Sequence, residues 1–157
     1  MFRTLQKIRA WLPVDGYYDM GRGPLVSREE QESGYPLSMC MTCGCCVDAC
    51  PQYNKLDVPR RTGETEEEYV ARRNAEFDRH FIGAFAISQV VLFNTHPTGR
   101  HTGTERLEAL IAEGGIQNCG NAQNCVTVCP KEIPLTTSIG AAGRAATIHS
   151  LKRWFDR

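Results

Sequence analysis

The sequence has no excess of charge of either sign and no long apolar run. It contains 18 Lys and Arg and 18 Asp and Glu, so the formal net charge of its 157 residues is zero. Because a nucleic-acid-binding surface normally carries a basic excess, we expect no nucleic-acid partner. The longest apolar stretch, Phe81–Phe93, is interrupted by Gly83, Ser88 and Gln89. It is shorter than the roughly 20 apolar residues of a membrane-spanning helix.

Signatures of catalysis are missing as well. The chain has no glycine-rich phosphate loop, no dinucleotide-binding fingerprint and no nucleophile placed with a base. Its four histidines are scattered, and only His96, in a loop with Pro97 and Gly99, is kept as a candidate functional residue. We therefore expect no complete active site on this chain alone.

Signals for β-strands are also scarce, which predicts a mainly α domain. A helix with Phe2, Leu5, Ile8 and Trp11 or Leu12 on one face is expected before Pro13, rather than a transit peptide, because this stretch has no Ser. The other expected segments are irregular wrapping chain at Gly16–Pro36, a helix with a capping box at Thr65–Glu68, a buried helix at Phe81–Phe93, a second capping box at Thr102–Glu105 and a last helix after Pro134. On the charged helix, the candidate inward positions are Tyr69, the stem of Arg73, and Phe77. On the last helix they are either Ile139, Ala142, Ala146 and His149, or Ile148, Leu151 and Phe155.

Eight cysteines are what the sequence has in abundance, and their arrangement favours metal over disulfides. Five of them lie within Cys40–Cys50, where disulfide geometry would be strained. Disulfides belong to oxidising compartments, and the sequence has no secretory signal with an apolar core. We therefore expect reduced thiols that bind metal.

The first cysteine group has the spacing of a bacterial-type ferredoxin. Cys40, Cys43, Cys46 and Cys50, followed by Pro51, spell C-x2-C-x2-C-x3-C-P. In this motif three thiolates bind one cluster and the fourth binds the other cluster. A zinc site needs only four ligands and would leave a second cysteine group unexplained. The spacing therefore favours iron–sulfur clusters over a structural zinc module.

The second group repeats this spacing with one position changed. Cys119, Cys125 and Cys129, followed by Pro130, match the first group, but Ala122 stands where its second cysteine would be. Each group follows a segment long enough for one or two helices. The repeat predicts two related halves around a pseudo-twofold axis, as in two-cluster ferredoxins.

If the last cysteine of each group binds the cluster of the other group, the seven cysteines fall into two ligand sets. The sets are Cys40, Cys43, Cys46 and Cys129 for a [4Fe–4S] cluster, and Cys50, Cys119 and Cys125 for the other cluster. A cubane with one corner unliganded tends to lose that iron, which predicts a [3Fe–4S] cluster at the second set. The alternative is a [4Fe–4S] cluster whose fourth iron has water or another ligand. Cys45 is left over, and we interpret it as a buried packing residue or a thiol donor to cluster sulfur.

These residues resemble the C-terminal domain of the iron–sulfur subunit of succinate dehydrogenase and fumarate reductase, an alpha-helical ferredoxin-like fold. The resemblance runs from about Trp11 to the C-terminus and includes Pro134–Gly140. Leu92–Gly99 and Glu113–Cys125 are most similar to the bacterial menaquinone-linked type. We accordingly expect a linker helix and wrapping segment at residues 1–36 and the helical dicluster domain at 37–157.

The resemblance implies an electron-transfer subunit, or a fragment of one, in an enzyme complex of the tricarboxylic acid cycle. Electrons would pass between an FAD-containing flavoprotein subunit and a membrane quinone, menaquinone in this type, through the two clusters with the ligand sets given above. The other implied partner is a membrane-anchor or cytochrome b subunit. The implied location is the cytoplasmic face of the bacterial inner membrane, as a peripheral subunit.

The sequence departs from the family in three places. The family's N-terminal [2Fe–2S] domain, with its C-x4-C-x2-C pattern, has no counterpart here, so we expect a fragment, a split gene or a truncated product. Some members have an aromatic residue and a histidine near quinone where this chain has Gln52–Lys55 and Gly120, which leaves Pro51 as a candidate quinone neighbour. The stretch Lys55–His80 is expected to be an insertion.

Two other classes of iron–sulfur protein fit the sequence less well. Iron–sulfur subunits of the heterodisulfide reductase or glycolate oxidase type usually carry two full four-cysteine runs, so Ala122 counts against them. Free two-cluster ferredoxins are usually shorter and more acidic than this neutral chain. The direction of electron flow is not encoded in the spacing, because cluster potentials depend on hydrogen bonds, charge and solvent exposure.

Overall fold

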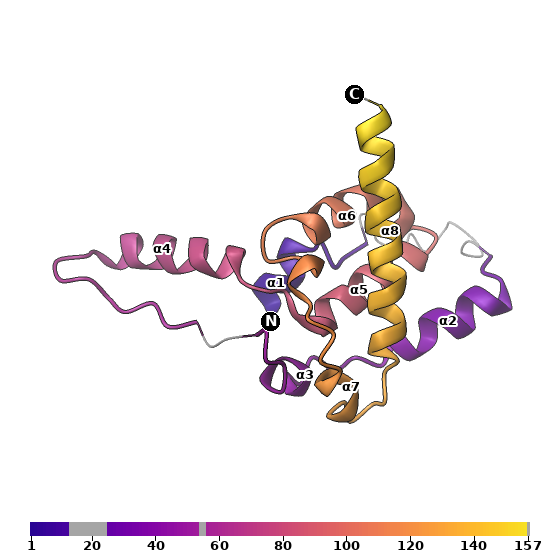
Figure 1. Cartoon of the computed structure of the whole chain (residues 1–157), viewed down its shortest axis with the longest axis horizontal. Coiled ribbons are helices and arrows are strands. Elements are labelled where there is room, and N and C mark those ends of the chain that lie inside the picture. Colours follow the sequence, from indigo (N-terminus) through magenta and orange to yellow (C-terminus); the bar gives the residue numbers. More distant parts are fainter. Residues whose placement is uncertain (13–24, 54–55, 157) are drawn as a thin grey trace, which may run out of the picture.

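The computed structural model describes residues 1–12, 25–53 and 56–156, and the regular secondary structure within them is all helical (Figure 1). The α-helices are α1 (Phe2–Lys7), α2 (Arg28–Ser38), α3 (Cys45–Asp48), α4 (Glu66–Arg79), α5 (Gly83–Thr95), α6 (Gly103–Ile111), α7 (Asn124–Thr127) and α8 (Leu135–Phe155). Two short 3-10 helices, η1 (Gly99–Thr102) and η2 (Ile116–Asn118), flank α6. The expected mainly α fold is confirmed.

Helix α5 is the centre of the domain. It packs against α8, α2, α6 and α3, and every residue from Phe81 to Ser88 is buried. Because the run Phe81–Phe93 is apolar on nearly all sides, it has no polar face to offer to water, and neighbouring helices cover it. The buried helix expected in this run is confirmed.

Helix α1 is shorter than expected. It ends at Lys7, Ile8 caps it, and Arg9 has a φ of 52° in the left-handed region. The expected stop, Pro13, lies outside the described residues. Ile8 is fully buried, as expected for the core face, whereas Phe2 is 82% exposed. Phe2 is therefore not part of the inward face.

Helix α2 corrects the expectation of irregular chain at Gly16–Pro36. The first part of that stretch lies outside the described residues, but the second part forms most of α2. The Glu30 N–H donates to the Ser27 hydroxyl at 3.2 Å, and the Ser27 N–H donates to the Glu30 carboxylate at 3.3 Å. This capping box stabilises the first turn. Further along the helix, which includes Pro36, Gly34 and Leu37 are buried, and α2 packs against α5.

Helix α4 projects away from the core (Figure 1), and none of its residues is fully buried. The capping box expected between Thr65 and Glu68 is confirmed. Of the expected inward side chains, Tyr69 and Phe77 are half-buried, but Arg73 is exposed. A charged guanidinium is more stable in water than against apolar surface when no partner faces it.

The capping box expected at Thr102 is wrong. The 3-10 helix η1 runs directly into α6, so no extended residue precedes the helix. The Thr102 hydroxyl donates to the Gly99 carbonyl at 3.3 Å and accepts from the Arg106 guanidinium at 2.8 Å. Thr102 therefore fixes the buried Arg106 rather than capping α6.

Helix α8 buries only part of its length. Ala142 and Ala146 are buried, and Ile139 and His149 are half-buried, as expected. The helix then continues beyond its neighbours (Figure 1), so the other candidate inward positions are wrong: Ile148 is 49%, Leu151 53% and Phe155 75% exposed. In the described part of the chain, no helix combines the length and the apolar character needed to cross a bilayer.

We expect Ile87→Ala to lower the free energy of unfolding by about 2–5 kcal/mol, because it deletes a side chain that is fully buried in α5. Ile148→Ala, at a half-exposed position of α8, is the matched control and should change it by about 0.5 kcal/mol or less. Urea unfolding of the anaerobic protein, followed by far-UV circular dichroism, measures both. Equal effects would contradict the central position of α5.

Candidate metal centres

The two cysteine groups form loops with the same backbone conformation. In the first loop Thr42 has a φ of 52° and Gly44 a φ of 92°. In the second loop the matching residues Asn121 and Gln123 have φ values of 52° and 62°. Each loop then enters a one-turn helix, α3 or α7, that leads to the last cysteine of its group. The repeat in the sequence is therefore also a repeat in the backbone.

Four of the thiols surround one small cavity, which we call the four-thiol cavity. They come from the residues after α2, the first loop, α3 and the residues after α7, and they are Cys40, Cys43, Cys46 and Cys129. Phe85 of α5 and Leu135 of α8 line the same cavity with apolar side chains. One thiol of the second repeat therefore lines the same cavity as three thiols of the first repeat.

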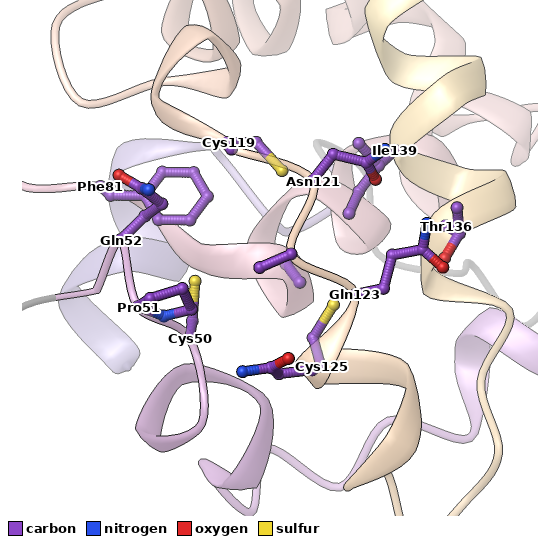
Figure 2. Close-up of a pocket in the computed structure, with 14 residues that line it drawn as sticks. Cys50, Pro51, Gln52, Phe81, Cys119, Asn121, Gln123, Cys125, Thr136 and Ile139 are labelled. Carbon is purple, nitrogen blue, oxygen red and sulfur yellow. The ribbon is translucent and has the colours of Figure 1, made fainter.

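The remaining three expected ligands line a second small cavity, the three-thiol cavity. The sulfurs of Cys50, Cys119 and Cys125 point into the same space (Figure 2). Cys50 comes from the first repeat, so the exchange between repeats is mutual. Ala122 also lines this cavity. The position of the missing cysteine therefore presents a methyl group to the cavity.

The surroundings of the buried thiols disfavour a bare thiolate. Burial raises the pKa of Cys46 to about 12, and the nearby Cys40 and Cys125 add to this rise. Burial also raises the pKa of Cys125. A thiolate in either cavity therefore needs a compensating positive charge, which a bound metal supplies.

The two sets of thiols fit iron–sulfur clusters by donor type and by arrangement. In the ranges the structure describes, no three His, Cys, Asp or Glu side chains form a group that could hold a single ion. The thiolates of a cluster bind separate irons and so surround a volume, which is how the thiols are placed around both cavities.

Cys45 and His96 lie outside both cavities. Cys45 is exposed, so its interpretation as a buried packing residue is wrong. The pKa of Cys43 is lowered by hydrogen bonds from the Cys45 backbone N–H and from the Cys45 thiol, which makes Cys45 a donor to a predicted ligand. The His96 Nδ1 accepts from the N–H groups of Thr98 at 3.2 Å and Gly99 at 3.4 Å, which gives it a structural role in its loop.

Pro51, the candidate quinone neighbour, and the adjacent Gln52 both line the three-thiol cavity (Figure 2). Other lining residues were not expected from the sequence. The start of α5 contributes Phe81 and Ala84 to the three-thiol cavity and Phe85 to the four-thiol cavity. The only sequence signal for these α5 residues is the apolar run that contains them, which indicates burial but not contact with a site.

Comparison with known proteins identifies related chains. The 4Fe-4S dicluster domain family matches residues 36–133. The succinate dehydrogenase iron–sulfur subunit of Bacillus subtilis (strain 168) is 44% identical over 155 residues, which cover 99% of this chain and 53% of the relative. The fumarate reductase iron–sulfur subunit of Wolinella succinogenes is 24% identical over 135 residues, 85% of this chain and 47% of the relative. The chain thus spans about half the length of these relatives.

Proposed function

Because the chain belongs to the 4Fe-4S dicluster domain family, we propose that it is an electron-transfer module with a [4Fe–4S] cluster in the four-thiol cavity and a [3Fe–4S] cluster in the three-thiol cavity. The proposed ligands are Cys40, Cys43, Cys46 and Cys129 for the first cluster, and Cys50, Cys119 and Cys125 for the second. The observation that carries this proposal is the division of seven thiols into sets of four and three around two cavities.

The four-thiol cavity supports a cluster with every iron bound by protein. Each corner of a cubane needs one thiolate, and four thiols line this cavity. When bound, the two clusters supply one-electron redox chemistry. The chain's own residues hold them in place, and Phe85 and Leu135 line the four-thiol cavity with apolar surface.

The three-thiol cavity supports a cluster with one iron fewer. Ala122 corresponds to Cys43 of the first repeat, and its methyl group cannot bind iron. The side chains of Gln52, Asn121 and Gln123 also line this cavity. They are neutral amides and weaker iron ligands than a thiolate, so they do not replace the missing cysteine.

We also propose that the module works in a succinate dehydrogenase or fumarate reductase complex. Its 44% identity to an iron–sulfur subunit of that class supports this. In this proposal it passes electrons between a flavoprotein subunit that holds FAD and menaquinone at a membrane-anchor subunit. It would sit as a peripheral subunit on the cytoplasmic face of the membrane. Pro51, beside the three-thiol cavity, is the candidate quinone neighbour.

The surface of the domain favours a docked module over a free carrier. The exposed end of α8 carries Leu151, Trp154 and Phe155, which are 53%, 69% and 75% exposed. Apolar side chains gathered on a surface generally mark a contact with another molecule. Small soluble carriers instead tend to present charge.

The cluster assignment is tested by iron and acid-labile sulfide analysis with EPR spectroscopy of anaerobically reconstituted protein. We expect roughly seven irons per chain, a three-iron signal in the oxidised state and a [4Fe–4S] signal in the reduced state. Eight irons with no three-iron signal would favour a two-cubane carrier or a heterodisulfide reductase relative. Zinc without sulfide would contradict electron transfer altogether.

Ala122→Cys tests the missing ligand directly. We expect the variant to take up roughly one more iron per chain and to lose the three-iron EPR signal, because a fourth thiolate then faces the three-thiol cavity. Ala75→Cys, at an exposed position of α4, adds a thiol outside both cavities and is the matched control. A three-iron signal that persists in Ala122→Cys would count against the [3Fe–4S] assignment.

A further inference from the structure

The last two turns of α8 carry an apolar surface on the side of the helix that faces away from the core. We call this surface the apolar stripe, and its exposed side chains are Ile148, Leu151, Trp154 and Phe155. Leu151 follows the buried Ala142 by nine residues, and Phe155 follows the buried Ala146 by nine. Nine residues make about two and a half turns of an α-helix. The stripe and the core face therefore lie on opposite sides of α8.

Contacts with a carboxylate of α6 hold the stripe in this orientation. The Arg153 guanidinium donates to the Glu108 carboxylate at 2.7 Å, and the His149 Nε2 lies 2.7 Å from the other Glu108 oxygen. Both partners of Glu108 come from the last two turns of α8. The end of the helix is thus fixed to the domain, although it extends beyond its neighbours (Figure 1).

Helix α8 contains three basic residues and no acidic residue. Two of the three, Arg144 and Lys152, lie four residues before and four residues after Ile148, and both are exposed. Residues four apart are neighbours on one helix face, so these two cations border the apolar stripe. Asp156 follows the helix as its C-cap residue. An apolar surface bordered by cations is complementary to an anionic lipid surface, where phosphates lie directly above the acyl chains.

The face of α8 that carries Trp154 also leads to the three-thiol cavity. Thr136, in the first turn, lines that cavity (Figure 2). Trp154 follows Thr136 by 18 residues, which is about five turns and about 27 Å, so the two lie on the same face. Between them this face presents Gly140, Arg144 and Thr147, which are all exposed. A broad, flat surface laid along α8 would therefore meet both the stripe and the edge of the cavity, and a bilayer is such a surface.

We propose, as an extension of the membrane location proposed above, that the apolar stripe of α8 binds directly to the headgroup region of an anionic bilayer. Trp154 and Phe155 enter the boundary between headgroups and acyl chains, which aromatic side chains favour. Arg144 and Lys152 lie against lipid phosphates. This contact belongs to the chain itself, and it turns the side of the three-thiol cavity that Thr136 lines toward the membrane.

The test is sedimentation of the cluster-loaded protein with vesicles of equal parts phosphatidylcholine and phosphatidylglycerol. We expect binding that is at least about tenfold weaker to phosphatidylcholine alone, because each of two cations contributes about fivefold at an anionic surface. Lys152→Glu should weaken binding to the anionic vesicles at least about fivefold. Arg73→Glu, at an exposed position of α4, is its matched control and should leave binding unchanged.

The apolar contribution is tested with Trp154→Ala, which should weaken binding to the same vesicles about tenfold, because a large apolar side chain no longer leaves water. Phe2→Ala is the matched control, since Phe2 is an exposed aromatic residue of α1 and lies outside the stripe. Both substitutions are at exposed positions, so both proteins should retain their clusters.

Tryptophan fluorescence locates the contact. The chain has two Trp residues, so Trp11→Phe leaves Trp154 as the only one. Anionic vesicles with brominated acyl chains should quench the fluorescence of this variant. They should leave the fluorescence of Trp154→Phe, which reports on Trp11, unchanged.

Cluster-loaded protein that does not sediment with anionic vesicles, or that binds equally well after Trp154→Ala, would overturn the inference. A dimer that forms without lipid and dissociates in Trp154→Ala, seen by sedimentation velocity, would assign the stripe to a second copy of the chain instead. Iron analysis and EPR of the same samples test the proposed function separately, since missing clusters would contradict that proposal and not the lipid contact.

Discussion

The exchange of thiols between the two halves of the chain is the constraint on which the rest of the structure depends. Cys50 of the first group lies with Cys119 and Cys125, and Cys129 of the second group lies with Cys40, Cys43 and Cys46. Neither cavity can form from one half alone. The two repeats must therefore come together although about half of the chain separates their cysteines, and the buried helix α5 lines both cavities.

This constraint links the stability of the fold to the bound clusters. Burial raises the pKa of Cys46 to about 12, so below that pH the folded protein without a cluster would hold a neutral thiol there. Binding of a cluster then releases that proton, because iron binds the thiolate. The same residues that bury the thiols, those of α5, also form the core. Helix α5 therefore contributes both to the packing of the core and to the surroundings of the clusters.

Most of the site is predictable from the sequence because its determinants are local. Two-residue gaps between cysteines fix which sulfurs can converge, and Ala122 marks the incomplete set by its place in the repeat. Helix α5 is predictable for a similar reason, since a run that is apolar on all sides can only be a buried element. The ligand sets themselves stay a prediction until a cluster is measured. So do the boundary at residue 36 and the insertion at Lys55–His80.

The features that the sequence does not predict depend on competition or on distant contacts. In α2, Gly34 and Pro36 indicate irregular chain, but the helix begins at the capping box of Ser27 and Glu30 and packs against α5, where Gly34 and Leu37 are buried. At Thr102 the local sequence matches a capping box, yet the preceding 3-10 turn and the buried Arg106 engage the hydroxyl instead. The role of α5 beside the cavities rests on packing across the fold, which no local pattern encodes.

The central claim is the exchange of ligands, and EPR of Cys129→Ser tests it most directly. Cys129 stands in the second group, only four residues from Cys125. The exchange predicts that Cys129→Ser alters the reduced [4Fe–4S] signal and leaves the oxidised three-iron signal unchanged. Cys125→Ser should alter the three-iron signal and leave the [4Fe–4S] signal unchanged. Loss of the three-iron signal alone in Cys129→Ser would mean that each group binds its own cluster, and would contradict the account.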